Sequence, residues 1–311
     1  MNMKTVYLNK FMSSVVAELE MNGRYGTAHV CGSVLRSVMA FGGEGLPVSG
    51  ITPLWLKAYE GYLLHKGGKG LAWNTVSTYM RMLQAVYNRA VVRKLAAFIP
   101  HQFRDVFTGR KADHRRVLER DDMQKLLLDR DPDITSPGMA WARACLELMF
   151  RFHGMPFVDL AHLRKSDLKD GYLTLRRRKT GMPLSARVDG RAMQLLERYR
   201  NRDDTSPYLL CFLDGNLEGM AAYRDYQRIL RLLNSRLRAL ALWKKVQGKV
   251  TSYSARHTWA TVGRYCHIPI EVISEGLGHA SVTTTEGYMK GFGNSRMDRA
   301  NKVIMNYIFK G

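Results

Sequence analysis

The stretch Tyr253-Ser254-Ala255-Arg256-His257-Thr258-Trp259-Ala260-Thr261 opens the most informative part of this chain, and two shorter motifs follow it, Leu277-Gly278-His279 and Thr283-Thr284-Thr285-Glu286-Gly287-Tyr288. Arg256 precedes His279 by 23 residues, and Tyr288 comes nine residues after His279. Upstream, residues 171–181 predict a strand and a hairpin turn that ends in Lys179-Thr180-Gly181. Each motif alone is a weak signal. Together, in this order and at these spacings, the motifs form a strong signal.

The composition points to a polyanionic partner. The chain has 311 residues, which favours two domains over one. Lys and Arg number 48 against 27 Asp and Glu, so the formal net charge is +21. An excess of this size is typical of proteins that bind nucleic acid. An anionic membrane surface would instead require a basic amphipathic or lipidated segment, and none is recognisable.

Several protein classes are excluded by simple patterns. No stretch approaches the roughly 18 consecutive apolar residues of a membrane span, and the first ten residues contain no signal-peptide core. The cysteines are far apart and form no C-x-x-C pair, so we expect reduced, mostly buried thiols in a cytoplasmic protein, without a zinc site or disulfides. They are Cys31, Cys145, Cys211 and Cys266.

The spacing of apolar residues predicts a mainly α-helical chain with a small β-hairpin or sheet, an α+β fold of two domains. Residues 1–105 are expected to form a module of four or five helices, in which Thr52 and Pro53 open one helix and Asn74 caps another. Residues 106–120 are basic and lack an apolar period, which predicts a linker that either lies along a phosphate backbone or is a solvated connector. Residues 121–311 form the second domain.

This ordered set of motifs resembles the tyrosine recombinase (phage integrase) family. In that family a hairpin lysine, an Arg-His pair opening a helix, a Leu-Gly-His turn and a C-terminal tyrosine form one active site. The helical module looks like the family's core-binding, SAM-like DNA-binding domain, so the resemblance covers nearly the whole chain. It implies a site-specific DNA recombinase, acting in integration, excision or inversion through a 3′-phosphotyrosine intermediate.

The chemistry of phosphodiester cleavage explains these residue types. Attack builds charge on the non-bridging oxygens, which the guanidinium of Arg256 stabilises by bidentate hydrogen bonds. Tyr288 is the expected nucleophile, although a phenol of ordinary pKa, about 10, must first lose its proton. His279 is placed to bind the phosphate or assist proton transfer, and Lys179 to protonate the leaving 5′-oxygen. The phosphotyrosine keeps the bond energy, so no ATP, metal or other cofactor is expected.

One departure from the family pattern concerns the first catalytic arginine. The family has a Gly-x-Arg-x-x-Glu-like turn there, whereas this chain reads Gly154-Met155-Pro156-Phe157-Val158-Asp159. Pro156 cannot stabilise phosphate charge. Arg177 is the first candidate substitute, because it stands two residues before Lys179 and is expected on the same face of one strand. Arg151, one turn before the motif, is the second candidate, and a third reading is that the charge is missing.

The other departure lies in the usual His-x-x-Arg motif, where the chain has Tyr253 in place of histidine. Tyr253 donates a hydrogen bond but is a poor base at neutral pH, so it either holds the phosphate or packs. His257 is expected to be structural. Both departures resemble the integrase and invertase subgroup of Bacteroides-type bacteria.

The resemblance also implies how DNA is held. The two domains are expected to form a C-shaped clamp around double-stranded DNA with inverted-repeat recombination sites. Thr75, Thr78 and Arg81 lie on the less apolar side of their predicted helix, suited either to DNA contacts or to a surface without a partner. Four strands are cut in recombination, so a homo-tetramer on DNA is implied. The apolar tail after Tyr288 either closes its own core or docks on a neighbouring subunit.

Two rival functions stay open. One is a catalytically inactive DNA-binding protein of the same fold, architectural or regulatory, which Pro156 and Tyr253 would favour. The other is a nicking enzyme of the topoisomerase type, without sequence preference. About ten residues precede the first expected helix, so we expect no separate arm-binding domain, which favours inversion or a simple integration. The target sequence and any accessory protein are not specified by the chain.

Overall fold

The computed structural model describes residues 5–111, 117–128, 136–279, 281–286 and 301. The chain divides into two compact units, one of residues 1–112 with 218–223 and one of residues 113–217 with 224–311. Each unit has an apolar core of its own. Among the described helices, none is both long and apolar enough to cross a membrane.

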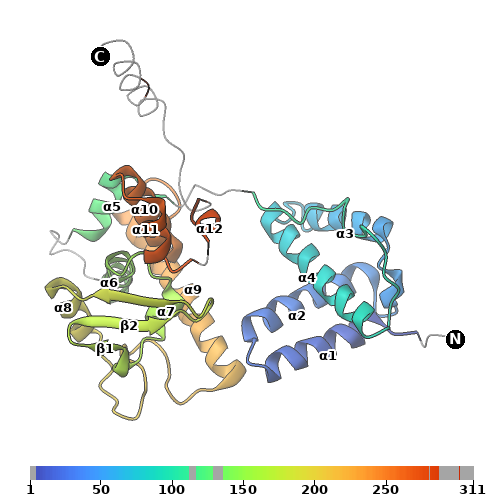
Figure 1. The fold of residues 1–311 in the computed structure, drawn as a ribbon, viewed down its shortest axis with the longest axis horizontal. Helices are drawn as coiled ribbons and strands as arrows, with labels where there is room; N and C mark the ends of the chain where they lie inside the picture. The colour runs from blue at the N-terminus through green and yellow to red at the C-terminus, as the bar shows by residue number, and fades with distance from the viewer. Residues whose placement is uncertain (1–4, 112–116, 129–135, 280, 287–300, 302–311) are drawn as a thin grey trace. The chain divides into compact units, whose positions relative to one another are not determined.

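The first unit is a bundle of helices around one core (Figure 1). Its elements are α1 (Leu8–Met21), α2 (Tyr25–Gly42), the 3-10 turn η1 (Val48–Gly50), α3 (Pro53–His65) and α4 (Trp73–Val92). Helices α1 and α2 lie side by side, and both α2 and α3 pack against α4. Apolar residues three and four apart explain the packing, because they place one face of each helix against the core. On α4 this face comprises Val76, Met80, Leu83, Val86, Tyr87 and Ala90.

Of the two helix starts expected in this unit, one is confirmed and one is wrong. The hydroxyl of Thr52 accepts the N–H of Trp55 at 3.1 Å, with proline at the first position of α3. Asn74 does not cap α4, which begins at Trp73. Its side-chain amide instead forms two hydrogen bonds of 2.8 Å with the backbone of Lys111 and is therefore not available to cap the helix.

The described parts of the expected linker are anchored rather than free. The N–H of Phe107 donates to the carboxylate of Glu60 at 2.6 Å, and the Lys111 ammonium lies 4.2 Å from the centroid of the Trp73 ring. In the second unit, the N–H of Leu118 donates to the buried hydroxyl of Thr258 at 3.0 Å. Both ends of this stretch are thus fixed to the unit on their own side.

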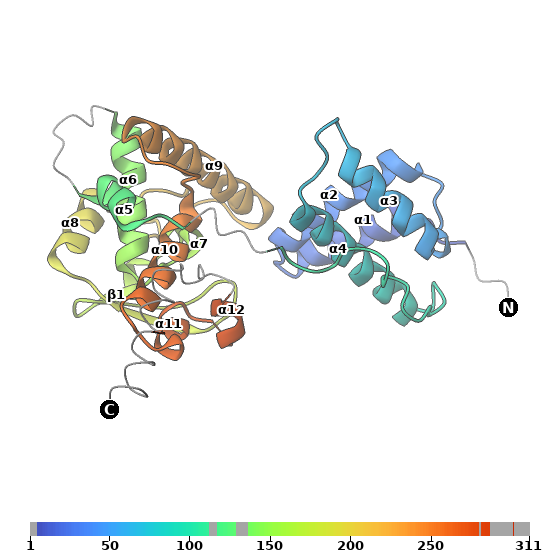
Figure 2. The same cartoon turned by 90° about the horizontal axis from the view of Figure 1, so that it is seen from above.

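The second unit surrounds helix α6 (Pro137–Arg151), whose residues 142–149 are all buried. Figure 2 shows α6 in the middle of this unit, with α8, α9 and α10 around it. The other helical elements are α5 (Arg120–Leu127), α7 (Phe157–Ala161), the 3-10 turn η2 (Lys165–Asp167), α8 (Gly190–Arg198), α9 (Gly219–Trp243), α10 (Ser252–Tyr265), α11 (Ile270–Gly276) and α12 (Val282–Glu286). Residues 219–223 at the start of α9 belong to the first unit. The expected architecture, mainly helical with a small sheet, is confirmed.

The sheet has three antiparallel strands in the order β1 (Leu168–Lys169), β2 (Tyr172–Arg176) and β3 (Pro183–Arg187). Asp170 and Gly171 connect β1 to β2 with φ of 51° and 77°, as a two-residue hairpin turn requires. Alternation along β2 and β3 buries Leu173, Leu184 and Ala186. The turn between β2 and β3 closes through two backbone hydrogen bonds, in which Arg177 bonds Met182 and Gly181 at 2.9 and 2.8 Å.

Candidate active site

Arg256 is a buried cation in the first half of α10, with 2% of its surface exposed. The helix starts after Thr251, whose N–H donates to the hydroxyl of Ser254 at 3.1 Å. Nη1 of Arg256 donates to the carbonyl of Gly154 at 3.0 Å, and Nη2 donates to the carbonyl of Leu277 at 2.7 Å. Because a guanidinium stays protonated, these contacts fix a permanent positive charge.

Gly154 allows the turn after α6 to lie directly on α10. Its φ is +66°, and a Cβ at this position would stand 2.9 Å from the Cα of Arg256. Any side chain would therefore push the turn away from the helix and remove one of the carbonyls that hold Arg256.

His279 follows the turn that ends α11. Its backbone N–H donates to the carbonyl of Ser274 at 3.0 Å, and Gly278 before it has a φ of +61°. The imidazole Nε2 lies 2.7 Å from Nη2 of Arg256, and Nδ1 lies 2.8 Å from the hydroxyl of Thr285. The Leu-Gly-His motif and the Arg-His motif thus meet in direct contact.

Burial, and after it the positive charges of Arg256, Arg177 and Lys179, together lower the pKa of His279 to about 3. The imidazole is therefore neutral at physiological pH. The charge of Lys179 acts on the same ring, although its side chain is exposed in the β2–β3 turn.

Arg177 joins this cluster. Only 5% of its surface is exposed, and its Nε donates to the carboxylate of Asp159 at 3.0 Å. Nη1 donates to the carbonyl of Leu277 and, at 3.3 Å, to the carbonyl of Gly278. Arg177 and Arg256 therefore share one acceptor, the Leu277 oxygen, although they lie far apart in the sequence.

The reason given for Arg177 from the sequence was wrong. Strand β2 ends at Arg176, so Arg177 and Lys179 do not lie on one face of one strand. The position of Arg177 comes from Asp159, whose second oxygen accepts the backbone N–H of Arg178 at 3.0 Å. One carboxylate thus holds both the guanidinium and the start of the turn.

Sequence reasoning quoted Asp159 in a motif but assigned it no role. The residue is 2% exposed, and a buried carboxylate requires compensation by a cation and hydrogen bonds. An acidic residue in the first turn of a short, otherwise apolar helix could have indicated a buried carboxylate. The sequence does not indicate which cation binds it. Thr285, also buried, was missed because two more threonines precede it.

Tyr253 lies nearer the surface than Arg256, Arg177 and His279. Tyr253 is three residues before Arg256 on α10 and is 40% exposed, and its ring centroid is 6.3 Å from that of His257. His257 itself is 9% exposed. Tyr288 lies outside the described residues.

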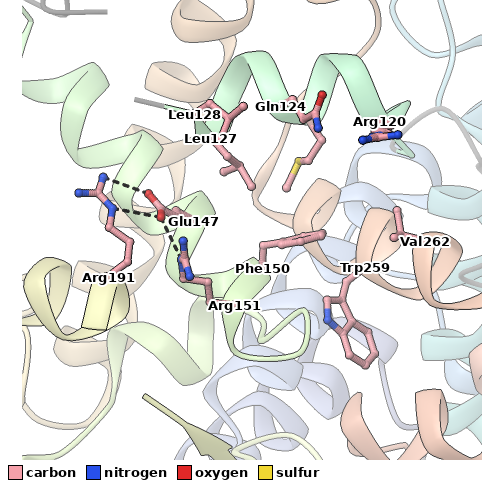
Figure 3. Close-up of a pocket in the computed structure, with 11 residues that line it drawn as sticks. Arg120, Gln124, Leu127, Leu128, Glu147, Phe150, Arg151, Arg191, Trp259 and Val262 are labelled. Carbon is pink, nitrogen blue, oxygen red and sulfur yellow. Dashed lines mark hydrogen bonds and ion pairs between the residues drawn. The ribbon is translucent and has the colours of Figure 1, made fainter. Parts of the chain in front are cut away.

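Arg151 is directed elsewhere. It forms ion pairs with Glu147 at 2.9 Å and Asp189 at 2.6 Å. Figure 3 shows Arg151 and Arg191 pointing at Glu147 beside a pocket of about 590 Å³. The described lining of this pocket includes none of the residues that meet at the Leu277 carbonyl.

Pro156 caps α7, and its carbonyl accepts two N–H groups of that helix.

The three residues suggested for DNA contact lie on α4. Thr75 and Thr78 are half-buried, Arg81 is exposed, and the hydroxyl of Thr78 donates to the carbonyl of Asn74 at 2.8 Å. Thr78 and Arg81 also line a groove of about 370 Å³ in the first unit, together with Arg24 and Arg89. The rest of its described lining is mostly apolar, and Arg89 forms an ion pair with Glu18 at 3.4 Å.

The arrangement of the second unit can bind a tetrahedral anion. Two guanidiniums and a neutral imidazole converge, while Asp159 balances one of the charges. In the described part of the chain, no three His, Cys, Asp or Glu side chains come together as a metal site would require.

The lowered pKa of His279 predicts a pH dependence of stability. Since histidine in the unfolded chain has a pKa of about 6.5, the unfolded state takes up a proton before the folded state does. The stabilising effect is complete above about pH 6.5 and is lost as the pH falls towards 3. His279→Gln should therefore lose stability less steeply than wild type between about pH 6.5 and 4, measured by urea unfolding. Equal slopes in the two proteins would contradict this protonation state.

Comparisons with known proteins agree with the geometry. The phage integrase SAM-like domain matches residues 7–104, and the phage integrase family matches residues 116–292. The tyrosine recombinase XerA of Pyrococcus furiosus is 29% identical over 140 residues, which are 44% of this chain and 46% of XerA. The chain thus spans about half the length of XerA. The putative integrase/recombinase y4gC of Sinorhizobium fredii is 26% identical over 180 residues, 56% of this chain and 88% of that protein.

Two solved structures are similar in fold. The structure of a lambda integrase dimer bound to a COC′ core site aligns with a TM-score of 0.65 at 18% identity. The alignment covers 93% of this chain and 97% of the lambda integrase chain. The structure of the Tn1549 transposon integrase in complex with transposon right end DNA aligns with a TM-score of 0.65 at 16% identity. The alignment covers 98% of this chain and 100% of the Tn1549 integrase chain. Since the family match extends over more than half of the 311 residues, the chain belongs to the phage integrase family of tyrosine recombinases.

Proposed function

We propose that this protein is a site-specific DNA recombinase that works through a 3′-phosphotyrosine intermediate. The phenolic oxygen of Tyr288 would attack the phosphorus, its bond to phosphorus would form, and the bond to the 5′-oxygen would break. A 5′-hydroxyl of another strand reverses the step. The observation that carries the proposal is the meeting of Arg177 and Arg256 on the Leu277 carbonyl beside His279.

This cluster suits a phosphodiester in its transition state. Two guanidiniums hold their positions before DNA arrives, so they can stabilise charge on the non-bridging oxygens without reorganising. Asp159 balances only part of their charge, which leaves an excess for the anion. Arg177 is the substitute for the arginine that Pro156 replaces, and its contact with the Leu277 carbonyl favours it over Arg151.

Proton transfers are assigned to side chains around the cluster. Lys179 stands exposed in the β2–β3 turn and would give a proton to the leaving 5′-oxygen. Neutral His279 would accept the phenolic proton of Tyr288 as its oxygen attacks the phosphorus. Tyr253 is exposed and lies on α10 with Arg256, and its hydroxyl would donate a hydrogen bond to the phosphate.

The proposed partner is double-stranded DNA with inverted-repeat sites, bound in the cytoplasm. The net charge of +21 supports it, as do the DNA complexes of lambda integrase and Tn1549 integrase. We assign residues 1–105 to DNA binding through Thr75, Thr78 and Arg81, residues 106–120 to a linker, and residues 121–311 to catalysis. The two domains would grip the duplex as a C-shaped clamp.

A homo-tetramer on DNA completes the proposal, because recombination cuts four strands. The lambda integrase tetramer bound to a Holliday junction supports this stoichiometry. Mass photometry of the protein on paired inverted-repeat duplexes should detect four subunits for two duplexes. Complexes that stop at one subunit for each duplex would contradict it.

The nucleophile is tested with a nicked duplex taken from inverted repeats beside the gene. Wild-type protein should give an SDS-resistant protein–DNA adduct, and Tyr288→Phe should give none while binding the same DNA. The phenol oxygen is the atom that bonds to phosphorus, so its loss removes the reaction. Tight, salt-sensitive binding without any adduct would instead favour the catalytically inactive protein. Relaxation of supercoils without sequence preference would favour a topoisomerase.

The substitute arginine is tested with a matched pair of variants. Arg177→Lys keeps a charge beside Asp159 but loses the forked hydrogen bonds, so adduct formation should fall by about a hundredfold or more. Arg151→Lys should stay within about threefold of wild type, because its ion pairs lie elsewhere. Thermal unfolding checks that both variants are folded. A large loss in Arg151→Lys with none in Arg177→Lys would reverse the assignment.

A further inference from the structure

His279 is held at both of its ring nitrogens. Nη2 of Arg256 lies 2.7 Å from Nε2, and the hydroxyl of Thr285 lies 2.8 Å from Nδ1. Thr285 belongs to α12 and is completely buried, whereas Thr283 and Thr284 beside it are exposed. Of three consecutive threonines, one therefore points at the imidazole.

These two contacts determine the tautomer of the ring. A guanidinium has hydrogen-bond donors and no acceptor, so Nε2 must receive the Arg256 hydrogen bond through its lone pair. A neutral imidazole then carries its proton on Nδ1, where it is donated to the Thr285 oxygen. The opposite tautomer would place an N–H of His279 against an N–H of Arg256 at 2.7 Å. In that tautomer the Thr285 hydroxyl would donate to Nδ1 instead of accepting from it.

The surroundings make this tautomer significant. Protonation of both nitrogens is disfavoured by burial and by three nearby cations. The ring therefore remains neutral, and the choice between its two neutral forms decides whether Nε2 is a donor or an acceptor. Because Nε2 faces Arg256, this choice sets the hydrogen bond that orients both side chains.

We propose that Thr285 is a positioning residue for DNA strand cleavage: its hydroxyl accepts the Nδ1–H of His279 and keeps the Nε2 lone pair turned toward Arg256. The inference rests on the recombinase function proposed above. It gives Nε2 the role of hydrogen-bond or proton acceptor at the site, with Arg256 as the donor to the phosphate.

Thr285 has a second consequence through its place in the chain. It stands three residues before Tyr288 in the sequence, at the end of the described part of this segment. Its hydrogen bond joins the Leu-Gly-His turn to the segment that leads to the nucleophile. The same contact thus orients the His279 ring and holds α12 against the Leu-Gly-His turn.

The tautomer itself is measured by a two-bond ¹H–¹⁵N correlation spectrum of the full-length protein labelled with ¹⁵N-histidine. His279 is assigned by the signal lost in His279→Gln. Wild type and Thr285→Ser should show the proton on Nδ1, because both keep a hydroxyl. Thr285→Val has nearly the same shape but leaves the buried Nδ1–H without an acceptor, so the share of the Nε2–H form should rise above that in wild type, at the expense of the contact with Arg256. An Nε2–H form in wild type, or an unchanged Nδ1–H form in Thr285→Val, would overturn the proposal.

The effect on the reaction is measured with the nicked inverted-repeat duplex. Loss of a hydrogen bond to a buried group predicts that Thr285→Val forms the adduct about tenfold more slowly, with DNA affinity within about twofold of wild type. Thr285→Ser should restore the rate, and Thr283→Val, exposed on the same helix, should leave it unchanged. A rate in Thr285→Val equal to wild type, or a serine variant as slow as the valine variant, would refute the positioning role.

The two measurements separate this inference from the function on which it rests. If wild type forms no adduct on any inverted-repeat duplex, the recombinase proposal fails while the spectrum still reports the tautomer. If wild type forms the adduct and the tautomer does not depend on Thr285, only the role of Thr285 fails.

Discussion

The carbonyl oxygen of Leu277 accepts hydrogen bonds from two arginines, and the rest of the site depends on that shared contact. Like charges placed side by side in a buried region repel each other and lose their hydration. The fold offsets this cost with Asp159 on one arginine and with carbonyl oxygens on both. A protonated His279 would add another positive charge, and its lowered pKa prevents that at neutral pH.

The elements that supply these groups come from distant parts of the sequence. The turn after α6 provides Gly154, the β2–β3 turn provides Arg177, and the end of α11 provides Leu277 and Gly278. The two glycines are needed for close approach, since a Cβ on Gly278 would lie 2.6 Å from the side chain of Arg177. The site therefore exists only when the second unit is folded. Because it is assembled in advance, little reorganisation is needed to receive an anion.

Sequence reasoning reached the helical architecture and the hairpin, because helical periodicity and turn motifs are local signals. The meeting of Arg256 with His279 was expected only from the resemblance of the ordered motifs to the tyrosine recombinase family. It named Arg177 for a reason that the structure does not support. The sequence places Arg177 beside Lys179, but contact with Asp159 depends on tertiary packing that periodicity does not describe. Asn74 shows the same limit, since its partner Lys111 is 37 residues away. Thr285 could not be told from its neighbours, because burial within a short helix follows from the fold around it.

We expect the reacting phosphate to lie between Arg177 and Arg256. The most direct measurement is an experimental structure of Tyr288→Phe bound to an uncleaved inverted-repeat duplex. Both guanidiniums should donate to non-bridging oxygens of one phosphate, with Asp159 still bound to Arg177. A phosphate held by Arg256 and Arg151, or one from which Arg177 stays remote, would contradict it.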